Sequence, residues 1–152
     1  MYLNCHTGHS FKYGTLPVKA LFAEAKRCNV HKLALTEINN TASWLDMLRT
    51  CNENRAQENG KTKFGKEPFD LDIVVGVEFR NDNDFLYIAL AKNNAGFEEI
   101  NRFLSHHNRE SKPFPTRAPR FDNVFMIYGS GAVETEELRS NEFIGIRKHQ
   151  LI

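Results

Sequence analysis

Residues 71–91, with the sequence LDIVVGVEFRNDNDFLYIALA, decide the fold of this chain. Leu71–Phe79 is rich in valine, isoleucine and phenylalanine, which are residue types that favour a β-strand. Asn81–Asp84 is a polar turn, and Phe85–Ala91 has the composition of a second strand. Because the turn between them is short, we expect the two strands to pair as an antiparallel hairpin.

Apolar residues recur at a spacing of three or four on both sides of this hairpin, which predicts amphipathic helices. The first begins near Thr15, which can cap it, and Pro17, which the first turn of a helix tolerates. The second runs from about Ala42 into the fifties, and Asn94 caps the third. Their expected inner faces are, in order, Val18, Leu21, Phe22, Ala25 and Cys28; Trp44, Leu45, Leu48 and Cys51; and Phe97, Ile100, Phe103, Leu104 and His107.

Short apolar segments between these helices predict further strands. We expect a buried strand at residues 1–5, strands at residues 32–37, 124–128 and 143–147, and a short helix from Thr135. Strands that alternate with helices are typical of an α/β fold with a mostly parallel sheet. The 152 residues are enough for one ordinary domain.

Composition and charge limit the classes of function. The 20 basic and 19 acidic residues give a net charge of +1, without the excess of lysine and arginine typical of proteins that bind DNA through their overall charge. Cys5, Cys28 and Cys51 form no CxxC spacing, which argues against a disulfide framework and against a zinc ribbon. No apolar run approaches the roughly 20 residues of a membrane-spanning helix, and the N-terminus lacks a signal-peptide pattern, so a cytoplasmic protein without a membrane partner is expected.

Polar side chains follow three of the expected strands near the point where each one ends. Asn4 and His6 follow the first, Glu37 and Asn39 follow the second, and Glu78 lies near the end of the third. Because functional residues of α/β folds gather at the carboxyl ends of parallel strands, we expect these side chains to be neighbours. An imidazole and two carboxylates suit a divalent ion such as Zn²⁺ or Mn²⁺, which would polarise a phosphate and activate water. The alternative is that the same side chains form hydrogen bonds with loop backbone.

Four segments occur in an order that is characteristic of one family. They are Asn4–Leu16 (NCHTGHSFKYGTL), Leu35–Asn40 (LTEINN), Val75–Phe79 (VGVEF) and Leu86–Asn93 (LYIALAKN), the last followed by Gly96-Phe97 and Ile100-Asn101. The first three resemble the first three motifs of the PHP (polymerase and histidinol phosphatase) domain. The fourth resembles the segment that follows them in bacterial replicative DNA polymerase III alpha subunits. The resemblance is colinear from Met1 to about Ser105, and it implies that residues 1–152 are a partial PHP domain, the N-terminal portion of a distorted (β/α)7 barrel within a longer chain.

The chain departs from the family's pattern in two motifs. The first family motif is His-x-His, where this chain has Asn4-Cys5-His6, and the second is Thr-Asp-His, where it has Thr36-Glu37-Ile38. The side chain of Ile38 has no ligating atom, and Asn4 offers only a neutral oxygen, which is a poor zinc ligand.

The remaining candidates for metal ligands follow from the resemblance. His6, Glu37 and Glu78 match family ligand positions, and Asn4 and His9 are further candidates. The resemblance therefore implies a zinc or manganese site that is degraded.

The leading interpretation is a PHP segment of a DNA polymerase III alpha subunit. In that family the intact domain can carry a metal-dependent 3′–5′ exonuclease, and where ligands are lost it serves as a scaffold. Nucleotidyl transfer belongs to a palm domain, which nothing in this chain resembles. The implied partners are the remainder of the polymerase chain, replisome subunits, and DNA through the parent protein. An open barrel edge would also favour self-association.

Two other functions stay open. One is a metal-dependent phosphoesterase or 3′–5′ exonuclease that uses His6, Glu37 and Glu78. The other is an α/β interaction module without phosphate chemistry. Lys12, Arg117 and Arg120 are candidate phosphate contacts or, alternatively, part of a solvated surface.

Overall fold

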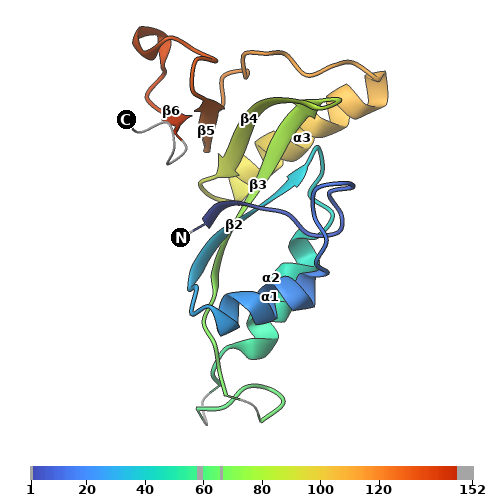
Figure 1. The fold of residues 1–152 in the computed structure, drawn as a ribbon, viewed down its shortest axis with the longest axis vertical. Coiled ribbons are helices and arrows are strands. Elements are labelled where there is room, and N and C mark those ends of the chain that lie inside the picture. Colours follow the sequence, from blue (N-terminus) through green and yellow to red (C-terminus); the bar gives the residue numbers. More distant parts are fainter. Residues whose placement is uncertain (1, 58–59, 66, 147–152) are drawn as a thin grey trace. The chain divides into compact units, whose positions relative to one another are not determined.

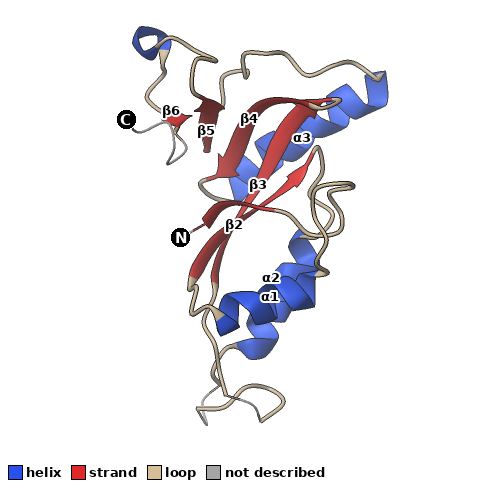
Figure 2. Ribbon diagram, viewed as in Figure 1, coloured by secondary structure: helices blue, strands red, loops and turns tan. Residues whose placement is uncertain are grey.

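The computed structural model describes residues 2–57, 60–65 and 67–146. The chain divides into two compact units, Met1–Val75 and Gly76–Ile152, and each has its own hydrophobic core. Figure 2 shows helices and strands in both units, which confirms a mixed α/β fold.

The first unit combines two parallel strands with two helices. It contains β1 (Tyr2–Cys5), α1 (Val18–Arg27), β2 (Lys32–Ile38), α2 (Trp44–Asn54) and the beginning of β3 (Asp72–Asn81). β1 pairs with β2, and α1 packs against α2 (Figure 1). The core that these elements enclose consists of Val18, Phe22, Ala25, Leu33, Leu35, Met47, Cys51, Phe69 and Leu71.

Three sequence-based expectations for the first unit are wrong. Cys28 was expected on the inner face of α1, but it is exposed, because it follows the last helical residue as the C-cap. The strand at residues 1–5 was expected to be buried, but Tyr2 and Leu3 in β1 are 60% and 47% exposed, because only Cys5 of this strand packs against the core. Leu45 and Leu48 were expected on the inner side of α2, and they are exposed. The buried face of this helix is formed by Met47, Thr50 and Cys51.

The second unit is built around the hairpin that the sequence predicts. β3 and β4 (Asp84–Ala91) are antiparallel, with Gly76 opposite Leu90 and Asn81 opposite Asp84. β4 is antiparallel to β5 (Val124–Gly129), and β5 is parallel to β6 (Glu142–Gly145). Of the four strand pairs described here, two are parallel and two antiparallel, which leaves a predominance of parallel strands unconfirmed.

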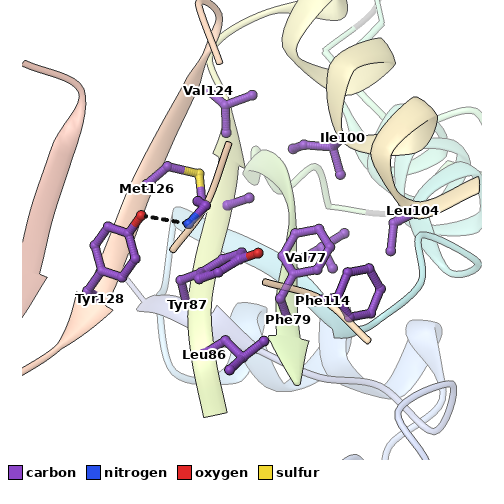
Figure 3. Close-up of a cluster of buried hydrophobic side chains, with 12 residues drawn as sticks. Val77, Phe79, Leu86, Tyr87, Ile100, Leu104, Phe114, Val124, Met126 and Tyr128 are labelled. Carbon is purple, nitrogen blue, oxygen red and sulfur yellow. Dashed lines mark hydrogen bonds between the residues drawn. The ribbon is translucent and has the colours of Figure 1, made fainter. Parts of the chain in front are cut away.

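Helix α3 (Asn94–Glu110) packs on the core of the second unit. It packs against β4 and β5, and a long irregular segment then leads to β5 (Figure 2). A turn of 3₁₀-helix, Thr135–Glu137, precedes β6. The side chains that fill the core are shown in Figure 3 and are Val77, Phe79, Leu86, Tyr87, Ala89, Ile100, Leu104, Phe114, Ala118, Val124, Met126 and Tyr128.

The ends of several elements differ from the sequence-based expectation. α1 begins at Val18 with Pro17 as its N-cap residue and without a side-chain capping bond, so Thr15 does not cap it. The N-cap of α3 is Asn93 and not Asn94, and the Asn93 side chain accepts a hydrogen bond of 3.0 Å from the backbone amide of Gly96. The last expected strand, at residues 143–147, corresponds to β6, and Arg147 lies outside the described residues. Among the described residues, no helix combines the length and the apolar character needed to cross a membrane.

Candidate functional site

The loop that follows β1 is folded tightly onto itself. The amide of Ser10 donates to the carbonyl of Thr7, and the amide of Gly14 donates to the carbonyl of Ser10, both at 2.9 Å. A Cβ atom on Gly14 would lie only 1.8 Å from the Thr7 carbonyl oxygen, so only glycine fits at this position. The loop at residues 6–16 is therefore held compactly beside the end of β2.

Glu37, near the end of β2, is the polar centre of the first unit. Its side chain is buried, with 1% exposure, and its carboxylate accepts hydrogen bonds from hydroxyl groups of Thr7, Ser10 and Ser43. The bonds from Thr7 Oγ1 and Ser43 Oγ measure 2.5 Å and 2.6 Å, and the Thr7 amide donates to the same oxygen at 3.0 Å. We refer to Thr7, Ser10, Glu37 and Ser43 together as the Glu37 cage. All four residues are buried.

Asn4 and His6 lie together on the neighbouring strand end. His6 Nε2 is 3.0 Å from Asn4 Oδ1, and the same oxygen accepts a hydrogen bond of 2.5 Å from the Thr36 hydroxyl. His6 is half-buried and Asn4 is exposed. The structure thus brings together two of the residues that the sequence singled out, joined by a hydrogen bond between their side chains.

His9 contributes to the loop mainly through its backbone. Its amide donates to the Thr7 hydroxyl, and its carbonyl accepts from the Asn40 side chain, both at 3.3 Å. The residue itself is exposed and lines an open groove of about 560 Å³ together with Lys19 and Arg49.

Glu78 lies in β3 within the second unit. Its side chain is 1% exposed, and it forms an ion pair with the guanidinium of Arg80, which is itself largely buried. Arg80 also donates to the carbonyl of Asn83 at 2.9 Å in the turn of the hairpin. One partner of this carboxylate is therefore a cation of its own strand.

The potential metal ligands of the first unit, taken by themselves, do not fit a zinc or manganese site. Among the described residues, no group of three or more histidine, cysteine, aspartate or glutamate side chains is arranged to hold a metal ion. The Glu37 carboxylate is already surrounded by hydroxyl donors, and Ile38 supplies only its backbone amide, which donates to Ser10 Oγ at 2.9 Å.

A third buried carboxylate, Glu142 in β6, was not identified from the sequence. It accepts hydrogen bonds from the Arg117 guanidinium at 2.6 Å, the Arg139 amide at 2.9 Å and the Tyr128 hydroxyl at 3.1 Å. The Tyr128 hydroxyl in turn accepts from the amide of Ala118 at 3.2 Å, which is the dashed line in Figure 3. Burial and the nearby Glu142 carboxylate raise the pKa of Tyr128. The Arg117 guanidinium, a candidate phosphate contact in the sequence, is thus paired with a carboxylate.

Comparison with curated proteins gives no match. A search of solved structures finds a protein from Bifidobacterium adolescentis described as a "putative metal-dependent phosphoesterase", with 19% sequence identity and a TM-score of 0.45. The match covers 71% of this chain and 33% of that chain, so this chain spans about a third of that protein's length. The model of the PHP domain family matches residues 3–139. Because that match covers most of the sequence, the chain belongs to the PHP domain family.

Proposed function

We propose that this chain is the N-terminal portion of a distorted (β/α)7 barrel within a replicative DNA polymerase III alpha subunit, and that it acts there as a scaffold. The colinear similarity of the segment up to about Ser105 supports the assignment to the polymerase. Membership of the PHP family supports the domain alone and agrees better with the second candidate function below. Its partners on this proposal are the remainder of the polymerase chain and replisome subunits, and DNA is contacted through the parent protein.

The observation that carries the scaffold role is the state of two ligand positions of the family. Asn4 fills one of them, and its side-chain oxygen is engaged by His6 and Thr36. Ile38 fills the other with a side chain that cannot ligate an ion. Without imidazole at these two positions, His6 is left as the imidazole at the end of β1, and Ile38 offers no nitrogen of the kind that zinc prefers at the end of β2.

Hydrolysis of a model phosphodiester tests the scaffold role. The purified chain is assayed with bis(p-nitrophenyl) phosphate in the presence of Mn²⁺ or Zn²⁺, with the His6→Ala variant as the matched control. We expect both proteins to give the rate of the metal ion alone. Metal-dependent turnover by the wild type that is lost in His6→Ala would overturn the proposal.

The polymerase assignment is tested separately from catalysis. We expect the gene's reading frame to continue beyond codon 152 for several hundred residues and to encode clustered aspartates of a polymerase palm. A stop codon at or soon after Ile152 would contradict the assignment.

The second candidate function is a metal-dependent phosphoesterase or 3′–5′ exonuclease. Family membership favours it, as do His6, Glu37 and Glu78, which match ligand positions of the family. The discriminating variant is Glu78→Gln. If the chain is a hydrolase that uses this carboxylate, the variant loses its activity. If the variant hydrolyses the substrate as fast as the wild type, the activity does not come from this site.

A further inference from the structure

Glu37 occupies a position that the family resemblance associates with metal binding, yet its carboxylate is surrounded by hydrogen-bond donors of the protein. The carboxylate has about four lone-pair sites that can accept hydrogen bonds. The Thr7 amide, the Thr7 hydroxyl, the Ser10 hydroxyl and the Ser43 hydroxyl all donate to it. Three of these bonds are made to Oε1 and the Ser10 bond is made to Oε2, so both oxygens already have donors from the protein.

Burial makes these bonds costly to lose. A buried carboxylate is tolerated only when hydrogen bonds or charges compensate for the water it has given up. The donors here are neutral and are themselves 0–1% exposed, so they have no water to replace the carboxylate as a partner. The carboxylate and its donors therefore depend on each other, because each supplies the hydrogen-bond partner that the other needs.

The cage joins three segments that are separate in the sequence. Thr7 and Ser10 belong to the loop after β1, Glu37 belongs to β2, and Ser43 is the N-cap residue of α2. Ser43 makes no side-chain capping bond to its own helix, and its hydroxyl is directed to Glu37. A negative charge at this place is also favoured by the dipole of α2, whose N-terminus begins at the next residue.

We propose that the Glu37 carboxylate organises this end of the first unit without a metal ion, by tying the loop after β1 and the start of α2 to β2. This inference rests on the proposed function in one respect, namely that the domain does not use Glu37 as a metal ligand. It assigns to Glu37 the task that bridging cations perform in metal sites, which is to hold loops from different strands in one arrangement. Zinc and chelators should then leave the stability of the first unit unchanged.

The first test measures hydrogen exchange at the Thr7 amide together with thermal unfolding. In the wild type this amide should exchange at least roughly 100-fold more slowly than in an unfolded peptide, because it donates to the buried Glu37 carboxylate. Glu37→Gln keeps the shape of the side chain but replaces one accepting oxygen by a donating amide. We expect it to lower the unfolding midpoint by roughly 5–10 °C and to speed up hydrogen exchange at the Thr7 amide. Glu136→Gln, on an exposed carboxylate, is the matched control and should change neither quantity.

Ser43→Ala keeps the test decisive if Glu37→Gln does not fold. This variant removes one donor and leaves the others, so a smaller loss of midpoint, roughly 2–5 °C, is expected with partial release of the Thr7 amide. Unchanged midpoints and unchanged exchange in both variants would overturn the inference.

Zinc distinguishes this inference from the proposed function. The cage predicts that the wild-type midpoint is the same with EDTA and with excess Zn²⁺. A ligand that binds only the folded state would raise the midpoint. A rise with Zn²⁺ that disappears in Glu37→Gln would overturn the cage. Metal-dependent hydrolysis with an intact, zinc-independent cage would overturn the scaffold role and leave the inference standing.

Discussion

Two tyrosines in the core of the second unit differ in what their hydroxyl groups contact. Tyr87 in β4 lies opposite Tyr128 in β5, and both rings are fully buried with centroids 5.7 Å apart. The Tyr128 hydroxyl joins the amide of Ala118 to the carboxylate of Glu142. Among the described residues, the Tyr87 hydroxyl has no hydrogen-bond partner. The same functional group therefore stabilises the fold at one position and imposes a cost at the other.

The pair gives a matched prediction at the scale of single atoms. Tyr128→Phe leaves the buried amide of Ala118 without an acceptor, and we expect it to lower the free energy of unfolding by about 1–3 kcal/mol. Tyr87→Phe removes an unsatisfied polar atom, so the free energy of unfolding should stay within about 0.5 kcal/mol of the wild type or rise. Urea unfolding of the two variants measures both quantities. The prediction fails if Tyr87→Phe is the more damaging change.

The start of α3 shows how much one residue matters at the scale of an element. Asn93 is the N-cap, because its side chain accepts a hydrogen bond of 3.0 Å from the Gly96 amide. The same side chain also donates to the Asn123 side chain at 3.0 Å. Asn94 is the first residue of the helix and is exposed. The sequence alone does not separate two adjacent asparagines, since both are good capping residues.

Alanine substitutions at these two asparagines test the cap. We expect Asn93→Ala to lower the free energy of unfolding by about 1 kcal/mol, because the Gly96 amide loses its partner. Asn94→Ala is the matched control and should stay within about 0.5 kcal/mol of the wild type, since alanine suits an exposed helical position. Thermal or urea unfolding measures the difference. Equal losses in the two variants would place the cap elsewhere.

The elements themselves could be predicted from the sequence where local pattern and burial agree. The hairpin of β3 and β4 follows from two strand-forming segments around a short polar turn, and the structure confirms it. The inner face of α2 was predicted less well, because Leu45 and Leu48 have the apolar character of core residues but lie on its exposed side. Thr50 is buried there instead, since its hydroxyl donates to the carbonyl of Asp46 at 2.7 Å. Local periodicity cannot show which of two adjacent faces the rest of the chain covers.

The contacts of the polar side chains at the strand ends could not be predicted from the sequence. The sequence singled out Asn4, His6 and Glu37, and the structure joins Asn4 to His6. The partners of Glu37 come from 30 residues earlier, at Thr7, and from six residues later, at Ser43. Serine and threonine are common in loops, so nothing local marks them as donors to a buried carboxylate. Their role depends on how the chain brings β1, β2 and α2 together.

Buried thiol and phenol groups make the stability of the whole molecule depend on pH. Burial raises the pKa of the Cys51 thiol from 9.0 to about 11, and burial followed by the nearby Tyr128 raises the pKa of Tyr87 above its ordinary value of 10.0. The folded chain therefore keeps these protons at a pH where the unfolded chain has lost them. Because the unfolded state then binds fewer protons, the contribution of these groups to the free energy of unfolding is fully present below about pH 9. This contribution decreases as the pH rises further.

We expect the midpoint of urea unfolding to be lower at about pH 10.5 than at about pH 8. Tyr87→Phe removes one of the linked protons and should show a smaller loss over the same interval, which separates this effect from general repulsion between charges. A wild-type midpoint that is constant or higher at alkaline pH would contradict the assignment. So would a loss in Tyr87→Phe that is as large as in the wild type.

Hydrogen bonds within the protein, and not a metal ion, organise the strand ends of this PHP-family chain on the proposal made above. Equilibrium dialysis of the purified chain against Zn²⁺, followed by elemental analysis, tests the claim most directly. We predict that bound zinc stays well below one ion per chain and is the same in the wild type, His6→Ala and Glu78→Gln. One or more tightly held ions per chain, lost in either variant, would contradict it.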